Sequence, residues 1–211
     1  MKVFDLTHTM TPTIPVFPGT EQPVIEKASD YGSDGYRESS LAFYSHVGTH
    51  MDAPAHIIPG GIELDSMDVN SFFGTAAVVD CSDITCGEIG MEHITPRLGI
   101  LDSVDFILFY TGHSRFWGSA KYFEPSPWLS MDAARYIVLS GKKGVGIDTF
   151  SVDPFGCLDS HGILLSGGAV IIENLCGLEQ LTGATTFELY AMPLKFEHSD
   201  GAPVRAAAII R

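Results

Sequence analysis

The sequence lacks any apolar run that could cross a bilayer. No stretch of about 18 apolar residues occurs in it, and the opening residues, MKVFDLTHTM, contain no apolar signal-peptide core. We therefore expect a soluble, cytoplasmic protein that does not bind membranes.

Basic residues are scarce. Twelve Lys and Arg side chains stand against 26 Asp and Glu, which gives a formal net charge of -14. A surface this acidic repels the phosphate backbone of nucleic acids. The charge balance excludes nucleic acid as an expected partner and favours a small-molecule substrate.

Cysteines are also few. The four of them, Cys81, Cys86, Cys157 and Cys176, form no CxxC pair. Their spacing does not suit a zinc knuckle, and their number is low for a disulfide scaffold of this length. We expect them to be reduced, and only Cys157, close in sequence to His161, to lie near a pocket.

The composition is that of a globular domain. The 211 residues are 45% hydrophobic and 18% charged, without an internal repeat, linker or low-complexity tract, so one domain over residues 1–211 is expected. Apolar runs predict strands in residues 2–6, 23–29, 36–46, 75–81, 104–112, 145–148, 169–175, 185–194 and 204–211. Together with a few helices, this pattern predicts a mixed α/β (α+β) fold around a β-barrel or sandwich-like core.

The longest predicted helix covers residues 130–144. Ser130 suits the N-cap, Asp132 suits the first turn, and Lys142, Lys143 and Gly144 are typical of a helix end. Two shorter helical turns are predicted over residues 161–168 and 177–183.

Histidines concentrate in the segment SHVGTHMDAPAH, residues 45–56, which holds three of the eight in the chain. His46, His50, Asp52 and His56 supply the imidazole and carboxylate groups that zinc and manganese sites use. Buried structural imidazoles each need a hydrogen-bond partner, so three in one short segment are unusual in an ordinary core. The apolar neighbours of these residues also disfavour a simple surface loop. The segment predicts a metal site.

Regular secondary structure cannot bring these side chains to one ion. In an ideal strand His46 and His50 would lie roughly 13 Å apart, and Pro54 would break a helix. We therefore expect a strand that bends sharply at Gly48, which allows the bend and leaves room for an ion.

Two later residues are further candidate ligands. Glu173 ends an apolar strand, where an unpaired carboxylate is costly. A salt bridge would also explain it. His161 opens the apolar turn before that strand, and both residues could converge on the first ion or on a second one beside it. The remaining histidines, His8, His93, His113 and His198, have no such neighbours and are expected to be structural or on the surface.

These motifs resemble those of a known family. HVGTHMDAPAH matches the HxGTHxDxPxH motif of the cyclase family of metal-dependent hydrolases, which includes bacterial kynurenine formamidase and isatin hydrolase. Residues 4–10 with 16–20, 144–154, 161–175 and 200–209 resemble further family segments in the same order. The resemblance therefore covers nearly the whole chain.

The resemblance implies a fold, an assembly and residue roles. It implies the swivelling β/β/α fold in a homodimer or larger homo-oligomer, with zinc or manganese as one or two divalent ions per chain. The first-metal ligands would be His46, His50 and Asp52; Asp52 and Glu173 would bridge to a second ion, which His161 would also bind; His56 would be the general acid/base. Phe17 stands where the formamidases place an aromatic residue against the substrate ring.

The expected reaction is hydrolysis of an amide-type C–N bond in an aryl formamide, such as N-formylkynurenine of tryptophan catabolism, or in a cyclic amide such as isatin. Water activated by the metal would attack the carbonyl, with His56 moving the proton. The alternatives are a metal-dependent cyclase, lyase or lactone hydrolase, and a non-catalytic metal-binding protein.

Two departures from the formamidases concern the substrate. Tyr110 stands where they tend to carry arginine, and Phe17 where they carry tryptophan. Phe17, Phe116 and Trp117 could wall an apolar pocket, although the last two could equally belong to the core.

Overall fold

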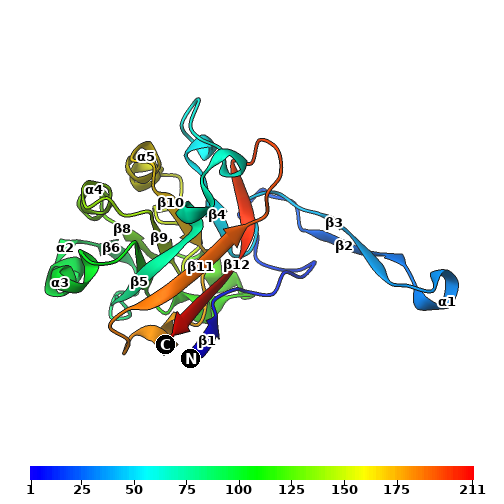
Figure 1. The fold of residues 1–211 in the computed structure, drawn as a ribbon, viewed down its shortest axis with the longest axis horizontal. Coiled ribbons are helices and arrows are strands. Elements are labelled where there is room, and N and C mark those ends of the chain that lie inside the picture. Colours follow the sequence, from blue (N-terminus) through cyan, green and yellow to red (C-terminus); the bar gives the residue numbers. More distant parts are fainter.

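The computed structural model describes all 211 residues, and its centre is a closed sheet of seven strands in the order β12-β11-β5-β7-β9-β10-β4, with β4 pairing back onto β12 (Figure 1). A further strand, β1, pairs with β12 outside the ring. The bounds are β1 Lys2–Asp5, β4 His50–Asp52, β5 Phe73–Asp80, β7 Phe106–Tyr110, β9 Gly144–Ile147, β10 Val170–Glu173, β11 Phe187–Pro193 and β12 Gly201–Ile210. The predicted mixed α/β fold with a barrel-like core is confirmed.

The central strands β5, β7, β9 and β10 run parallel and are buried on both faces. Successive side chains of a strand point to opposite faces, so Val78 and Leu108 lie in the cluster inside the ring, while Val79 and Ile107 lie in the cluster under the helices. Burial on both faces explains why these strands read as continuous apolar runs. Within the ring, Gly146 is needed for space, because a Cβ there would lie 2.6 Å from side-chain atoms of Leu108 and Leu175.

Helices α2 to α5 cover the outer face of this sheet (Figure 1). Their bounds are α2 Met91–Ile94, α3 Leu98–Leu101, α4 Met131–Leu139 and α5 Asp159–Ser166, and a small parallel sheet of β6 Gly87–Ile89 and β8 Pro127–Leu129 lies beside them. No helix of the chain combines the length and the apolar character that a bilayer crossing requires.

Helix α4 confirms the predicted N-cap and corrects the predicted end. The Ser130 hydroxyl accepts a hydrogen bond from the backbone N–H of Ala133 at 3.1 Å. The helix ends at Leu139, earlier than the lysines and Gly144 suggested, because Gly141 takes a left-handed conformation with φ of 66°. Lys142 lies beyond the helix and donates to the carbonyls of Asp102 and Val104.

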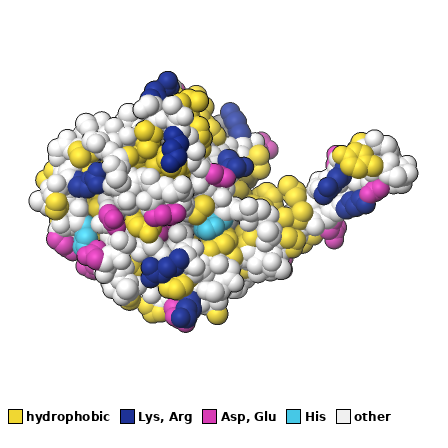
Figure 2. Space-filling model, turned by 90° about the horizontal axis from the view of Figure 1, so that it is seen from below, with side chains coloured by type: hydrophobic (Ala, Val, Ile, Leu, Met, Phe, Trp, Pro, Cys, Tyr) yellow, Lys and Arg dark blue, Asp and Glu magenta, His cyan; other side chains and the backbone are white.

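A two-stranded arm projects from the body (Figure 1). It consists of β2 Val24–Ser29, the short helix α1 Tyr31–Asp34 and β3 Glu38–Ala42, and none of these residues is buried. Hydrophobic atoms gather where the arm leaves the body and again near its tip (Figure 2). Both strands were predicted, but their projection away from the core was not.

Candidate metal centre

The histidine segment bends at Gly48, as predicted. Gly48 has a φ of 64°, in the left-handed region that glycine adopts without strain. The bend places the ring centroids of His46 and His50 5.2 Å apart. His46 lies before the bend, whereas His50 and Asp52 lie on β4 and face the same side.

Strand pairing adds the distant residues. Because β4 pairs with β10, Glu173 is the register partner of His50, and because β4 also pairs with β12, Gly201 is the partner of Asp52. Helix α5 brings His161 to the same end of the ring. The structure thus brings together all five residues named as metal ligands.

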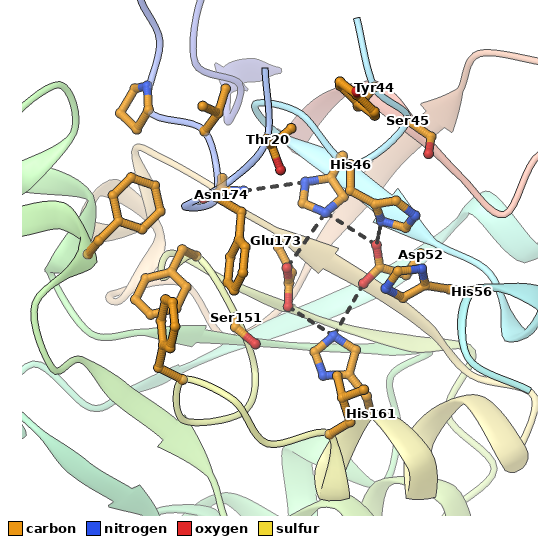
Figure 3. A pocket seen from close by; sticks show the side chains of 18 of the residues that line it. Thr20, Tyr44, Ser45, His46, Asp52, His56, Ser151, His161, Glu173 and Asn174 are labelled. Carbon is orange, nitrogen blue, oxygen red and sulfur yellow. Dashed lines mark hydrogen bonds and ion pairs between the residues drawn. The ribbon is translucent and has the colours of Figure 1, made fainter. Parts of the chain in front are cut away.

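Asp52 is the centre of the cluster (Figure 3). Its Oδ1 lies 2.7 Å from His46 Nδ1 and 3.2 Å from His50 Nε2. Its Oδ2 lies 3.6 Å from His161 Nε2, which is 3.4 Å from Glu173 Oε1. Glu173 Oε2 is 3.6 Å from His50 Nε2. Asp52 therefore belongs to two groups of possible ligands, His46–His50–Asp52 and Asp52–His161–Glu173.

The cluster fits a divalent cation. Asp52 Oδ2 is buried and has no hydrogen-bond partner, and such a carboxylate oxygen is costly to bury unless a cation faces it. Imidazole nitrogens and carboxylate oxygens are the donor set for zinc and manganese. The unpaired oxygen and the donors around it indicate where an ion would bind.

Two residues that sequence reasoning missed orient the ligands. Asp153 Oδ2 lies 2.7 Å from His161 Nδ1 and accepts from the His161 backbone N–H, which directs Nε2 toward the cluster. Asn174 donates to the Gly48 carbonyl at 2.8 Å, beside His50 Nδ1, and accepts from the Tyr122 hydroxyl at 2.6 Å. Both lie in segments that carried the family resemblance, but nothing in their spacing indicated these contacts.

His56 lies at the edge of the cluster, on the turn Pro54–His56. Its ring centroid is 3.8 Å from that of His46, and its Nδ1 is 3.7 Å from Asp200 Oδ2. Asp200, also missed, lies 2.9 Å from His46 Nε2. His46, His56 and Asp200 thus form a third group of close donors, and His56 is the only named site histidine outside the two groups that share Asp52.

Protonation of the cluster reflects its buried carboxylates. Burial lowers the pKa of His46, but hydrogen bonds and charges of Asp52 and Asp200 outweigh burial and raise it to about 9. Burial also lowers the pKa of His161. Asp153, Asp52 and Glu173 outweigh burial and raise this pKa to about 12. Burial lowers the pKa of His56; the charges of Asp52 and Asp200 oppose this, but those of His46 and His161 lower it further, and the net shift is downward. His56 is therefore the histidine suited to being neutral near pH 7.

The other histidines lie away from the cluster. His8 stacks on Trp117 at 4.0 Å, and a ring nitrogen of His113 lies 2.8 Å from the Tyr122 carbonyl. His93 lies beside Glu92, and His198 is at the surface beside Glu63.

A cavity of about 610 Å³ opens beside the cluster. Phe17 lines it, as predicted, together with Phe123, Phe150 and Phe155, and Cys157 also lies in the wall. Phe116 and Trp117 do not line it; they pack against the rings of His113 and His8. Phe123, Phe150 and Phe155 come from loops and carried no periodicity that could have indicated them.

The fold and the cluster define the class: an α/β barrel protein with a buried histidine–carboxylate site of the kind that binds divalent cations. The profile of the family described as "Putative cyclase" matches residues 4–154. The chain belongs to this cyclase family, as the motifs predicted.

Known relatives extend over the whole chain. A curated protein of Erythrobacter litoralis named kynurenine formamidase is 31% identical, over 97% of this chain and 92% of its own length. An uncharacterized protein of Methanocaldococcus jannaschii is 32% identical, over all of both chains. Among solved structures, isatin hydrolase A from Labrenzia aggregata superposes with a TM-score of 0.87 at 27% identity, covering 99% of this chain and 93% of its own.

Gly201 has no side chain and so leaves room for the His46 ring. A Cβ at residue 201 would lie 2.7 Å from His46 Nε2, so Gly201→Ala must displace this ring. We expect the affinity for Zn²⁺ or Mn²⁺ to fall about 10- to 100-fold, measured by competition with a chromophoric chelator. Gly99→Ala is the control, because a Cβ there meets nothing within 4 Å. An unchanged affinity in Gly201→Ala would show that His46 is not needed to bind the ion.

Metal loading should release protons. With a pKa of about 9 at His46 and about 12 at His161, both rings are protonated at pH 7 in the metal-free protein, and ligands must be deprotonated to bind a metal. We expect release of about two protons when both rings become ligands, and an affinity that rises as the pH increases from 6 to 9. Titration calorimetry in buffers of different ionisation enthalpy measures the protons; binding without release would contradict this assignment of ligands.

Proposed function

We propose that this protein is a metal-dependent hydrolase that cleaves an amide-type C–N bond of an aryl formamide or a cyclic amide. The observation that carries the proposal is the shared, buried Asp52 carboxylate beside an aromatic pocket that also contains His56. The names of the relatives, kynurenine formamidase and isatin hydrolase A, support hydrolysis of this bond type.

The proposed ligands form two groups around Asp52. His46, His50 and Asp52 would hold the first ion; Asp52, His161 and Glu173 would hold a second one where two are bound. Zinc or manganese suits both donor sets. When bound, such a cation polarises a carbonyl and lowers the pKa of water from 15.7 to about 7.

His56 is the proposed general acid/base. Its imidazole lies in the pocket at the edge of the cluster, and burial lowers its pKa, so it is ready to accept a proton at neutral pH. It would take the proton of the attacking water at one ring nitrogen and return it to the leaving nitrogen of the amide. Asp200, 3.7 Å from Nδ1, would stabilise the imidazolium that forms between these two transfers.

The aromatic side chains are proposed to position the substrate. Phe17 and Phe155 stack at 5.0 Å, and Phe150 lies with its centroid 6.3 Å from that of Phe155. An aryl group against these rings would place its amide toward Asp52 and His56, across the same cavity. In this arrangement Phe17 contacts the substrate ring.

The test is metal-dependent turnover with and without His56. We expect protein loaded with Zn²⁺ or Mn²⁺ to hydrolyse formanilide or isatin, and chelation to abolish this activity. We expect His56→Ala to lower kcat by about 10²- to 10⁴-fold while the metal content, measured by atomic emission, stays the same. His198→Ala, which removes a surface histidine, is the matched control.

Each other outcome has a distinct meaning. Loss of metal from His56→Ala would make His56 a ligand and disprove its separate role. Metal-dependent conversion of lactones or of other small substrates, without amide hydrolysis, would indicate the lactonase, cyclase or lyase alternative. Stoichiometric metal without any turnover would indicate a non-catalytic metal-binding protein.

We further propose that the chain, as a single domain, works as a homodimer in the cytoplasm. All four cysteines are free, which suits a reducing compartment. Isolated two-stranded ribbons are marginal in water, yet the arm of β2 and β3 exposes Val24, Tyr31 and Leu41. We propose that a second copy of the chain covers this arm, because a two-fold axis would bury the same arm residues on both chains.

The arm makes the assembly testable. We expect the wild-type protein to have about twice its chain mass of 22.8 kDa in multi-angle light scattering. The double substitution Tyr31→Arg with Leu41→Arg should weaken the dimer about tenfold or more, because it places charge in the buried part of the interface. Leu139→Arg, at the exposed end of α4, is the control. A monomeric wild type, or an unaffected double variant, would disprove an arm-mediated homodimer.

A further inference from the structure

The pocket contains no lysine or arginine side chain. None of the 12 Lys and Arg residues of the chain lines the cavity. Arg115, which follows the turn after β7, packs over the ring of Phe116, and Phe116 lies outside the cavity wall. The positive charge available to a substrate is therefore confined to the end of the cavity where the proposed ions and their histidine ligands lie.

Three acidic residues line the cavity. They are Asp52 and Glu173 at the closed end and Asp200 near the opening, where its side chain is 43% exposed. A carboxylate on a substrate that enters the pocket would pass close to the Asp200 carboxyl group.

The wall opposite the cluster is apolar. Phe17 and Phe155 stack with nearly parallel rings, at an interplanar angle of 9°. Phe150 and Phe123 extend the wall, with centroids 5.5 Å apart, and Leu158 continues it at the start of α5. A substituent that lies along this wall exchanges water for hydrocarbon, which suits an uncharged group and is costly for an unpaired carboxylate.

We infer that this pocket selects uncharged aromatic amides and discriminates against substrates whose ring carries a carboxylate. The inference rests on the proposed hydrolase function and adds the charge of the substrate to it. The reacting carbonyl occupies the cationic end of the pocket, so a distant carboxylate in the same molecule has no cation left to pair with.

A matched pair of substrates isolates the charge. 4-Formamidobenzamide and 4-formamidobenzoate have the same shape and differ in one negative charge. With metal-loaded wild-type protein, measured by formate release, we expect kcat/KM for the amide to exceed that for the acid by about tenfold or more.

A substitution in the wall tests the cause. Leu158→Arg places a guanidinium on a side chain that is 54% exposed at the pocket, and it should raise the acid-to-amide ratio of kcat/KM about tenfold. Leu139→Arg adds the same charge at an 86% exposed position outside the pocket and should leave the ratio unchanged.

The outcomes separate the two proposals. Hydrolysis of both compounds at equal kcat/KM by the wild type overturns the inference and leaves the hydrolase intact. A ratio that changes equally in Leu158→Arg and Leu139→Arg overturns it too, because overall charge would then be the cause. If neither compound nor isatin is hydrolysed by the metal-loaded protein, the hydrolase proposal fails and the inference fails with it.

Discussion

The site depends on one buried carboxylate, that of Asp52, which needs positive charge beside it. Asp52 is 1% exposed, one of its oxygens contacts two imidazoles, and the other has no hydrogen-bond partner. A charge in that position needs positive charge around it. In the metal-free chain the histidines supply it by taking up protons, and the carboxylates raise the pKa of His46 to about 9 and that of His161 to about 12. A divalent cation would neutralise the same carboxylates, so its binding would displace protons from the histidines.

Closure of the barrel is what makes this burial possible. Strand β4 has only three residues, yet it pairs with β10 on one side and with β12 on the other. The proposed ligands that are not on β4 reach the cluster from elements adjacent to it: His46 from the bend before β4, Glu173 from β10, and His161 from the helix that leads into β10. Asp200, which contacts His46, comes from the residue before β12. Gly48 takes the left-handed conformation at the bend, and Gly201 leaves the space that the ring of His46 needs. The same pairing that completes the core therefore assembles the site.

The parts of the site that could be predicted are those that lie close together in the sequence. His46, His50, Asp52 and His56 are in one short segment, and distances along a strand were enough to require a bend at Gly48. The buried strands were recognisable because both of their faces are apolar. Asp200, Asp153 and Asn174 were not recognisable as site residues, because they act through strand register and through loops, which a single sequence does not specify. For the same reason Phe123, Phe150 and Phe155 were missed. The two strands predicted over residues 23–29 and 36–46 were found, but nothing in the sequence indicated that they form an exposed arm.

The residues proposed for the chemistry lie on or next to the strands of the barrel, whereas those proposed to recognise the substrate lie on loops. The proposed ligands and the proton carrier are positioned by β4, β10, α5 and the turn after β4, all of which are held by the barrel. The residues that would contact the rest of a substrate come from the segment around Phe17 and from the loops around Phe123 and Phe155, where a substitution leaves the core untouched. A relative at 31% identity can therefore keep the same cluster while its loops recognise a different molecule. For this chain, the barrel supports the assignment of a reaction type. The substrate would be distinguished by the cavity-lining residues of these loops, which are largely apolar and include no lysine or arginine.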